Sequence, residues 1–406
     1  MYRLQILVIF ILIVFLDSTG SFKPNSFSGD GIIRVAVYAD SGVGEEAGTE
    51  TEYAKNIEST IKAFNPQCKT GLVKAIEIVS GALKDYDVII FPGGSGMAQS
   101  LSLGEDGRAA VVDFVKNGGG YIGICAGAYL AQDMDLSQPV LKISNAEVLN
   151  GAVDWDRGGG IIRAKINKPY LEYFPEFTGS ETFYLNYQSG PVFIPAGRKD
   201  MDPYEELIVF VSDVFHDSFK TKGESPGKAM FTVSEYGKGM TLLMSAHAEE
   251  TPGLKWMLYR MVEIAAKQDI TPPPPKYVNL KKFNREIMYD AKWRQRETRY
   301  LKIAKDKTKK SKDRINALKI LKNTGSKEAA RLAVRLLSDS SNPVKIYSAE
   351  MIIYYDHFSA IERLKDLLKK EKSLETVKAF KKALVHLTPS AKKKRTVIAV
   401  KTYSAK

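Results

Sequence analysis

Cysteine is scarce in this chain of 406 residues, which contains only Cys68 and Cys125. Two cysteines cannot build the multi-bridge framework of small secreted domains, although one bond between them is compatible with the count. Histidine is also scarce, with four residues, and no group of His and Cys has the spacing of a metal site. We therefore expect no metal and no cofactor, and a fold that depends on its hydrophobic core.

Long apolar runs are equally scarce, because only residues 4–16, LQILVIFILIVFL, form one. This run follows Arg3 and precedes the small-residue stretch STGS, which is the order of a secretory signal peptide cleaved after Gly20. It is shorter than the about 20 residues that span a bilayer. We expect export, to a periplasm or as a secreted protein; an uncleaved segment that anchors the chain in the membrane is the alternative.

Acidic residues are sparse only in the last third of the chain. Residues 1–269 hold 24 Lys and Arg against 34 Asp and Glu, whereas residues 270–406 hold 35 against 13. The boundary is 271-TPPPPK-276, whose prolines favour a stiff extended segment that ends helices and strands. The sequence therefore predicts two bodies of opposite charge in one chain.

The acidic part alternates short apolar runs with helical patterns, which predicts an α/β fold with a mostly parallel sheet covered by helices. Its middle portion, residues 140–235, is rich in Gly, Pro and aromatics and predicts additional strands and loops. We interpret 157-RGGGII-162 as a loop, because it does not match a dinucleotide-binding fingerprint.

The basic part has helical patterns that recur every 31 residues. RINALKIL at 314–321, KIYSAEMI at 345–352 and TVKAFKKA at 376–383 follow this step. Such a period is typical of arrays of helix hairpins, and it favours a HEAT-like region over an irregular helical bundle. The expected organisation is a signal peptide (1–20), an α/β domain (30–268), a proline-rich hinge with a basic helical linker (269–310), HEAT-like repeats (311–388) and a basic tail (389–406).

Cys125 stands in 119-GGYIGICAGAYL-130, where a buried strand pattern changes into a helical one. Gly123 and Gly127 flank it, as a cramped strand-to-helix turn requires. This turn predicts an exposed sulfur at a helix N-terminus, where unpaired N–H groups favour a thiolate. The residue types therefore indicate a nucleophile.

Two further segments supply what a nucleophile needs, and each follows an apolar strand pattern. In 91-FPGGSG-96 and at the turn itself, the backbone N–H groups of Gly94 and Ala126 are positioned to stabilise an oxyanion. In 245-SAHAEE-250, His247 is the expected base and Glu249 its orienting carboxylate, with Glu250 as the competing choice. The order of the three segments predicts a Cys-His-Glu triad, because each piece alone is a weak signal.

The blocks DVIIFPGG, GGGYIGICAGAY and SAHAE resemble the class I glutamine amidotransferase-like superfamily and, more narrowly, the N-terminal domain of eukaryotic-type biotin-protein ligases. The resemblance extends over residues 32–266 and includes 147-EVLNGAV-153 and 183-FYLNYQSGPVF-193. It implies a flavodoxin-like fold, the triad above, and substrate-binding positions at Gly93, Asn186 and Gly190. Ala248 replaces the proline that the superfamily usually has between His and Glu.

No biotin-ligase catalytic domain follows the resemblance, and no synthetase domain that could receive ammonia is present. We therefore predict an exported cysteine-dependent hydrolase of the amidase type, acting on a small-molecule or peptide amide, and not a biotin ligase. The alternative is a ligand-binding or scaffold protein without catalysis. In either case the basic helical region could dock a protein or an anionic envelope surface, and we expect no nucleic-acid partner.

Overall fold

The computed structural model describes residues 31–44, 50–132, 139–149, 158–177, 182–214 and 223–388. The predicted signal peptide and the predicted basic tail lie outside these ranges, so both stay predictions. Within them, no helix combines the length and apolar character that crossing a bilayer requires.

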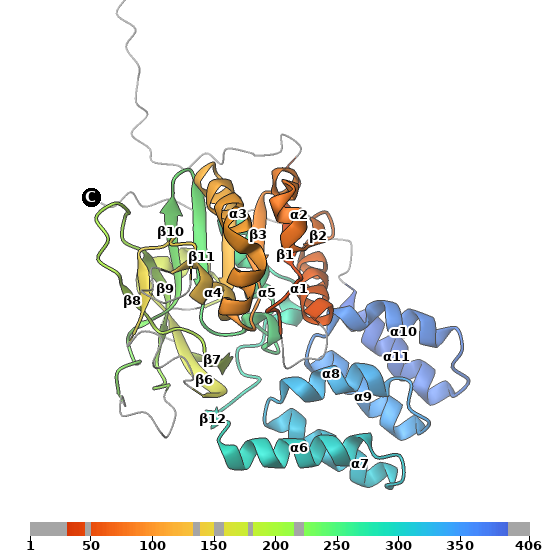
Figure 1. The fold of residues 1–406 in the computed structure, drawn as a ribbon. Helices are drawn as coiled ribbons and strands as arrows, with labels where there is room; N and C mark the ends of the chain where they lie inside the picture. The colour runs from red at the N-terminus through yellow and green to blue at the C-terminus, as the bar shows by residue number, and fades with distance from the viewer. Residues whose placement is uncertain are drawn as a thin grey trace, which may run out of the picture.

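Five parallel strands form one half of a 12-stranded sheet (Figure 1). They are β1 (Arg34–Tyr38), β2 (Lys69–Val73), β3 (Val88–Phe91), β4 (Gly120–Ile124) and β11 (Gly239–Met244). Their order, β2-β1-β3-β4-β11, is the flavodoxin-like order. Every residue of β3 and β4 is buried, which explains why VIIF and GYIGI do not alternate in polarity. The expected α/β fold class is confirmed.

Helices cover both faces of this parallel half. They are α1 (Glu50–Phe64), α2 (Ala75–Val79), α3 (Gly96–Lys116), α4 (Ala126–Ala131) and α5 (Trp256–Ala265). They form two groups. One group consists of α1 and α5, which pack against each other, and the other consists of α2, α3 and α4, in which α3 packs against both of its neighbours. Because crossovers between parallel strands are right-handed, the reversal of strand order at β1 places the two groups on opposite faces.

The other half of the sheet is antiparallel and begins where β10 pairs with β11. Its strands are β5 (Ala146–Val148), β6 (Gly159–Ile166), β7 (Thr182–Gln188), β8 (Phe193–Pro195), β9 (Glu205–Phe210), β10 (Ala229–Tyr236) and β12 (Ile287–Met288). The interpretation of 157-RGGGII-162 as a loop was wrong from Gly159 onward, because β6 pairs there with β7 and β12. A side chain at Gly160 would lie 2.0 Å from the Ile287 carbonyl, so the glycines permit the close pairing.

Among the described residues beyond the proline segment there are six α-helices: α6 (Ala291–Lys305), α7 (Ser311–Asn323), α8 (Lys327–Leu336), α9 (Asn342–Tyr354), α10 (Ile361–Leu368) and α11 (Leu374–Leu387). A serine caps α8, α9 and α11, with Ser326, Ser341 and Ser373 each accepting a hydrogen bond from a backbone N–H of the first turn. Such caps stabilise a helix by about 1 kcal/mol each. Helix α9 packs against α7, α8 and α11. The HEAT-like classification of these helices stays a prediction.

The helical region is attached to the α/β domain by a buried contact. Asp356, which follows α9, accepts a hydrogen bond from the Gly253 backbone at 3.1 Å and pairs with Lys282 at 3.3 Å and His386 at 2.7 Å. The ring of Tyr277, just beyond the prolines, packs edge-to-face against Phe358. The residues directly after the prolines therefore take part in the interface between the α/β domain and the helical region.

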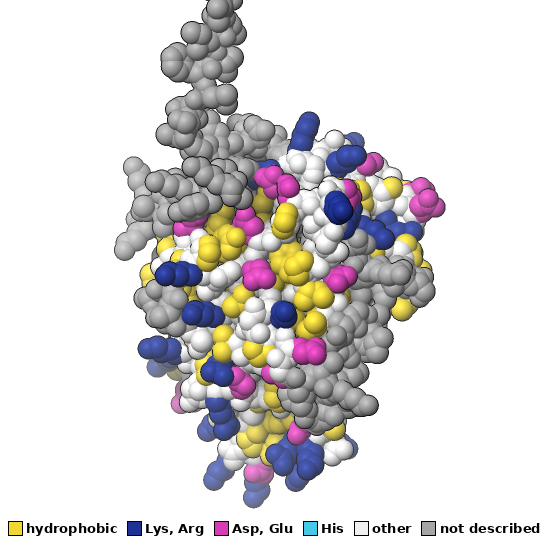
Figure 2. All heavy atoms as spheres, turned by 90° about the vertical axis from the view of Figure 1, so that its left-hand side faces the viewer, with side chains coloured by type: hydrophobic (Ala, Val, Ile, Leu, Met, Phe, Trp, Pro, Cys, Tyr) yellow, Lys and Arg dark blue, Asp and Glu magenta, His cyan; other side chains and the backbone are white. Residues whose placement is uncertain are grey.

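The exposed surface of the first helices is basic, as the charge count predicted. Figure 2 shows Lys and Arg side chains gathered at the lower end of the molecule, the end at which α6 and α7 lie in Figure 1. Arg294, Arg299 and Lys302 are among the exposed cations of α6. The partner of this surface stays a prediction.

His357, which follows Asp356, makes the stability of the contact between the helical region and the α/β domain dependent on pH. Burial, together with the positive charges of Lys255 and Arg331, lowers the pKa of His357 to about 3. The unfolded chain binds a proton here below pH about 6.5, whereas the folded chain does so only near pH 3, so this contribution to stability is lost as pH falls from 6.5 to 3.

We expect His357→Gln to remove this dependence. Between pH 7.5 and 5.0 the unfolding free energy of the variant should fall by about 2 kcal/mol less than that of the wild type, measured by urea denaturation. Ser359→Ala is the matched control, because it removes the 2.9 Å contact to His357 Nδ1 but keeps the imidazole. Equal pH dependence in wild type and His357→Gln would contradict the assignment.

Candidate active site

The segments singled out in the sequence meet at one edge of the sheet. Gly93 follows β3, Cys125 follows β4, and His247 follows β11, and the three strands are parallel neighbours or next neighbours. In such sheets the carboxyl ends of the strands lie at the same edge, outside which ligands bind. A side chain at Gly93 would lie 2.9 Å from the His247 ring and 3.5 Å from Cys125 Cβ, so the three residues are in contact.

Cys125 occupies a strained turn between β4 and α4. Its backbone has φ 50° and ψ −99°, a left-handed conformation that costs a non-glycine residue on the order of 1–3 kcal/mol. The Cys125 N–H donates to the Met244 carbonyl at 2.8 Å, which fixes the turn to β11. A Cβ at Gly123 would lie 2.5 Å from the Gly127 carbonyl, and one at Gly127 would lie 2.1 Å from the Phe91 carbonyl. The glycines are therefore required by close backbone approach.

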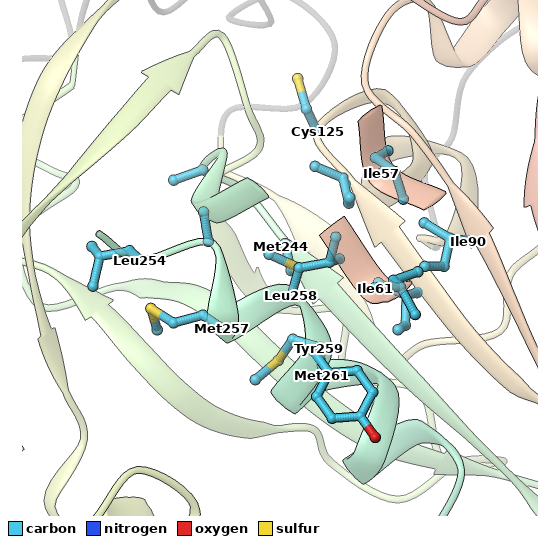
Figure 3. Packing of buried hydrophobic residues seen from close by; sticks show 14 of the residues in the cluster. Ile57, Ile61, Ile90, Cys125, Met244, Leu254, Met257, Leu258, Tyr259 and Met261 are labelled. Atoms are coloured by element: carbon cyan, nitrogen blue, oxygen red, sulfur yellow. The ribbon is translucent and has the colours of Figure 1, made fainter. Parts of the chain in front are cut away.

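The sulfur of Cys125 is less open than the sequence predicted. The residue is 8% exposed, because the end of β7 lies against it and Sγ donates to the Gln188 carbonyl at 3.3 Å. Tyr129 fixes this covering segment by donating to the Ser189 carbonyl at 3.0 Å. Figure 3 shows the sulfur pointing away from the packed cluster that includes Ile57 and Met244. The expectation of an exposed sulfur was wrong, because the pairing of β7 is not visible in the local sequence.

His247 lies between the thiol and a buried carboxylate. Its Nδ1 is 2.7 Å from Glu249 Oε1, and the ring also interacts with the side chain of Cys125. Burial and the charge of Lys327 lower the pKa of His247, but the charge of Glu249 and the hydrogen bonds to Cys125 and Glu249 outweigh them and raise it to about 9. The ring is thus fixed beside Glu249, and its role as a base for the thiol stays a prediction.

Tyr53 is a site residue that the sequence reasoning missed. Its hydroxyl donates to Glu249 Oε1 at 2.5 Å and lies 3.2 Å from His247 Nδ1. Burial and the charges of Glu249 and Glu250 raise the pKa of Tyr53 well above its ordinary value, so the phenol stays a donor. The available signal was a tyrosine on the same face of α1 as Ile57, since a buried hydroxyl requires a partner.

Glu250, the competing carboxylate, points to a different group of residues. Its Oε1 pairs with Arg331 at 2.8 Å and its Oε2 with Lys327 at 3.1 Å, both on α8. Burial raises the pKa of Glu250, but these two cations and His247 overcome that effect and hold it well below the ordinary value. The structure therefore places Glu249 against the histidine and Glu250 against the helical region.

The two backbone groups assigned to the oxyanion lie in the segments that follow β3 and β4. Ala126 is the first residue of α4, so its N–H has no acceptor within the helix. Gly94 lies in a loop whose neighbours are fixed to the segment after β1, with Gly44 N donating to Gly93 O at 3.0 Å and Ser95 N donating to Gly42 O at 2.8 Å. Their role in stabilising an oxyanion stays a prediction.

Asn186 and Gly190, which the resemblance associated with substrate, contact the segment that carries His247. The Asn186 carbonyl accepts from His247 N at 2.7 Å, and its side-chain amide donates to the Glu250 carbonyl at 3.0 Å. A side chain at Gly190 would lie 1.9 Å from the Ser245 carbonyl. Both residues thus hold the histidine turn in place, and a role in substrate binding stays a prediction.

The site also contains the group most similar to a metal ligand set. His247, Glu249 and Glu250 offer ligand atoms that all lie within 4.8 Å of one another. However, both oxygens of Glu250 are already paired with cations, and Oε1 of Glu249 holds Tyr53 and His247. A metal ion at this group would have to displace the cations that hold Glu250, whereas Oε2 of Glu249 is buried without a hydrogen-bond partner.

Comparison with known families supports part of the resemblance. A family model described as the N-terminal region of biotin-protein ligase matches residues 34–138, which include β1, β3 and the Cys125 turn. The resemblance is confirmed for that segment, and its extension to residue 266 stays a prediction. No curated protein matches the chain.

Three of the solved structures that match the chain are distant relatives in sequence and fold. The glutaminase domain of a Trypanosoma brucei CTPS is 16% identical over 59% of this chain and 96% of its own, with a TM-score of 0.38. A ThuA-like protein of Bacteroides uniformis is 16% identical over 58% and 89%, with a TM-score of 0.36. A β-galactosidase of Bacillus circulans is 13% identical over 59% of this chain but only 32% of its own, with a TM-score of 0.34. At such TM-scores the architecture rests on the chain's own topology.

Proposed function

We propose that the protein is a cysteine-dependent hydrolase that cleaves an amide or related acyl bond. The observation that carries the proposal is the continuous contact from Cys125 through His247 to Glu249, with 2.7 Å between Nδ1 and Oε1. The match of the Cys125 segment to the biotin-protein ligase N-terminal model is compatible with it. A nucleophile, a base and an orienting group in this arrangement are the parts that acyl transfer requires.

The proposed reaction has two steps. The Cys125 thiolate attacks the carbonyl carbon, the N–H groups of Gly94 and Ala126 stabilise the oxyanion, and His247 gives its proton to the departing amine, which leaves a thioester on Cys125. Water then attacks the thioester, His247 accepts a proton from that water, and the thiolate leaves with a carboxylic acid as product. Glu249 keeps His247 oriented and stabilises the imidazolium, and Tyr53 holds Glu249.

The test is the rate at which Cys125 reacts with iodoacetamide in a Cys68→Ala background. Iodoacetamide reacts with the thiolate form of cysteine, which a neighbouring imidazolium favours. We therefore expect His247→Ala to slow alkylation at pH 7 by about 10-fold.

His386→Gln is the matched control, because this histidine lies on α11 and pairs with Asp356, away from Cys125. It should leave the alkylation rate unchanged. The proposal would be overturned if Cys125 is alkylated slowly in the parent protein and at the same rate in His247→Ala. That result would favour the alternative function, in which the same site binds a ligand without turnover.

A further inference from the structure

The helical region reaches the proposed active site through α8. Glu250, adjacent in sequence to Glu249, is held by Lys327 and Arg331 from the first two turns of this helix. The side chain of Glu250 is only 8% exposed, so this contact differs from a surface ion pair, whose energy is small. Lys327 is the first residue of α8 and directly follows the Ser326 cap. The cap fixes the start of the helix, and with it the position of Lys327.

Arg331 also contacts Tyr53, the residue whose hydroxyl is hydrogen-bonded to Glu249. Its guanidinium carbon lies 5.9 Å from the ring centre of Tyr53, within the range of a cation–π interaction. Tyr53 in turn donates to Glu249 Oε1. One residue of α8 is therefore linked to Glu249 by two routes, through the backbone of Glu250 and through the phenol of Tyr53.

Charge explains why the site needs these cations. Two carboxylates, Glu249 and Glu250, follow His247 in one buried turn, and like charges in a buried site disfavour each other. Within the described residues, the charged or titratable groups that face this turn include Tyr53, Cys125, Lys255, Tyr289, Lys327, Arg331 and His357. The two α8 residues neutralise Glu250, so that Glu249 is the carboxylate that interacts with the ring.

We propose that Lys327 and Arg331 are positioning residues for the Cys125, His247 and Glu249 site, and that the helical region is a functional part of that site. This inference rests on the proposed function. The residues act through Glu250 and Tyr53, and neither is assigned a contact with substrate. A chain without α8 would leave Glu250 as an uncompensated buried charge beside His247, which costs several kcal/mol or forces the turn to open.

The experiment follows the pH titration of the His247 ring by NMR with ring-labelled histidine, with His247→Ala to identify its signal. Loss of both cations leaves the negative charge of Glu250 beside the imidazolium and stabilises it. The titration midpoint in Lys327→Gln/Arg331→Gln should therefore rise by about one pH unit or more. Glu250→Gln alone removes the negative charge and keeps the cations, so its midpoint should fall. The opposite directions separate an electrostatic role from general loss of structure.

Three further variants sharpen the result. Arg335→Gln is the matched control, because Arg335 is an exposed arginine one turn further along α8, and it should not move the midpoint. Arg331→Lys keeps the charge and should keep the midpoint. In the triple variant that adds Glu250→Gln, the upward shift should disappear, as a double-mutant cycle requires for residues that act through a shared partner.

An unchanged midpoint in folded Lys327→Gln/Arg331→Gln would overturn the inference. So would an upward shift that persists in full when Glu250 is also replaced. If the double variant does not fold, the single variant Lys327→Gln decides the matter: its midpoint should rise, and an unchanged midpoint would overturn the inference. If the alkylation rate of Cys125 is the same with and without His247, the proposed function fails whatever the titration midpoint of His247 is. If the alkylation rate depends on His247 but the midpoint does not change when Lys327 and Arg331 are replaced, only the present inference fails.

Discussion

Replacing Cys125 with serine is expected to lower the turnover of any substrate by at least about 10³-fold while the fold stays intact. A serine hydroxyl fits the space of the thiol, which is 8% exposed, but it ionises far less readily and the site is built around sulfur. The measurement uses a panel of amides and activated esters, with mass spectrometry to detect an acyl group on residue 125 and its release by water.

Cys68→Ala is the control for this experiment. Cys68 is buried and precedes the first residue of β2, so it lies at the amino ends of the parallel strands, opposite the site. This variant should keep its turnover. Undiminished turnover in Cys125→Ser would remove Cys125 from the mechanism, whereas tight ligand binding without product in the wild type would support the non-catalytic alternative.

The residues of the site that could be predicted from the sequence are those that directly follow an apolar strand. Cys125, Gly94 and His247 each follow a continuous apolar strand, and parallel strands deliver their carboxyl ends to one edge. The glycines around Cys125 are dictated by backbone contacts within the same turn and with β3. These features need no knowledge of distant pairing, so the expectation that the three segments meet at one edge follows from them, whereas the flavodoxin-like order was implied only by the family resemblance.

The parts that escaped prediction depend on contacts between distant segments. Gln188 covers the sulfur from 63 positions away, and Arg331 reaches Glu250 from 81 positions away. The glycine run before Ile161 became a strand because β7, β9 and β12 pair with β6, and pairing outweighed a weak local preference. A single sequence gives the residue types at such contacts but not their partners.

The dependence of the site on the helical region leads to the second large prediction, which concerns Arg314 of α7. This side chain is 2% exposed. Its guanidinium binds both carboxylate oxygens of Asp339 at 2.9 and 2.6 Å and donates from Nε to the Ala304 carbonyl at 2.9 Å. It thereby joins the end of α6 to the segment between α8 and α9. Removing one partner of such a buried pair leaves an uncompensated charge.

Arg314→Ala should therefore destabilise the helical region by about 3–5 kcal/mol, measured by urea denaturation. Arg335→Ala, on the exposed face of α8, should change stability by less than about 0.5 kcal/mol. Arg314→Met combined with Asp339→Leu should recover much of the loss, because it removes both charges. A loss below about 1 kcal/mol in Arg314→Ala would show that the pair is not needed to hold the helices together. If the full loss is seen, the urea concentration that unfolds α8 should also change the titration of His247, because Lys327 and Arg331 leave Glu250 when the helix does.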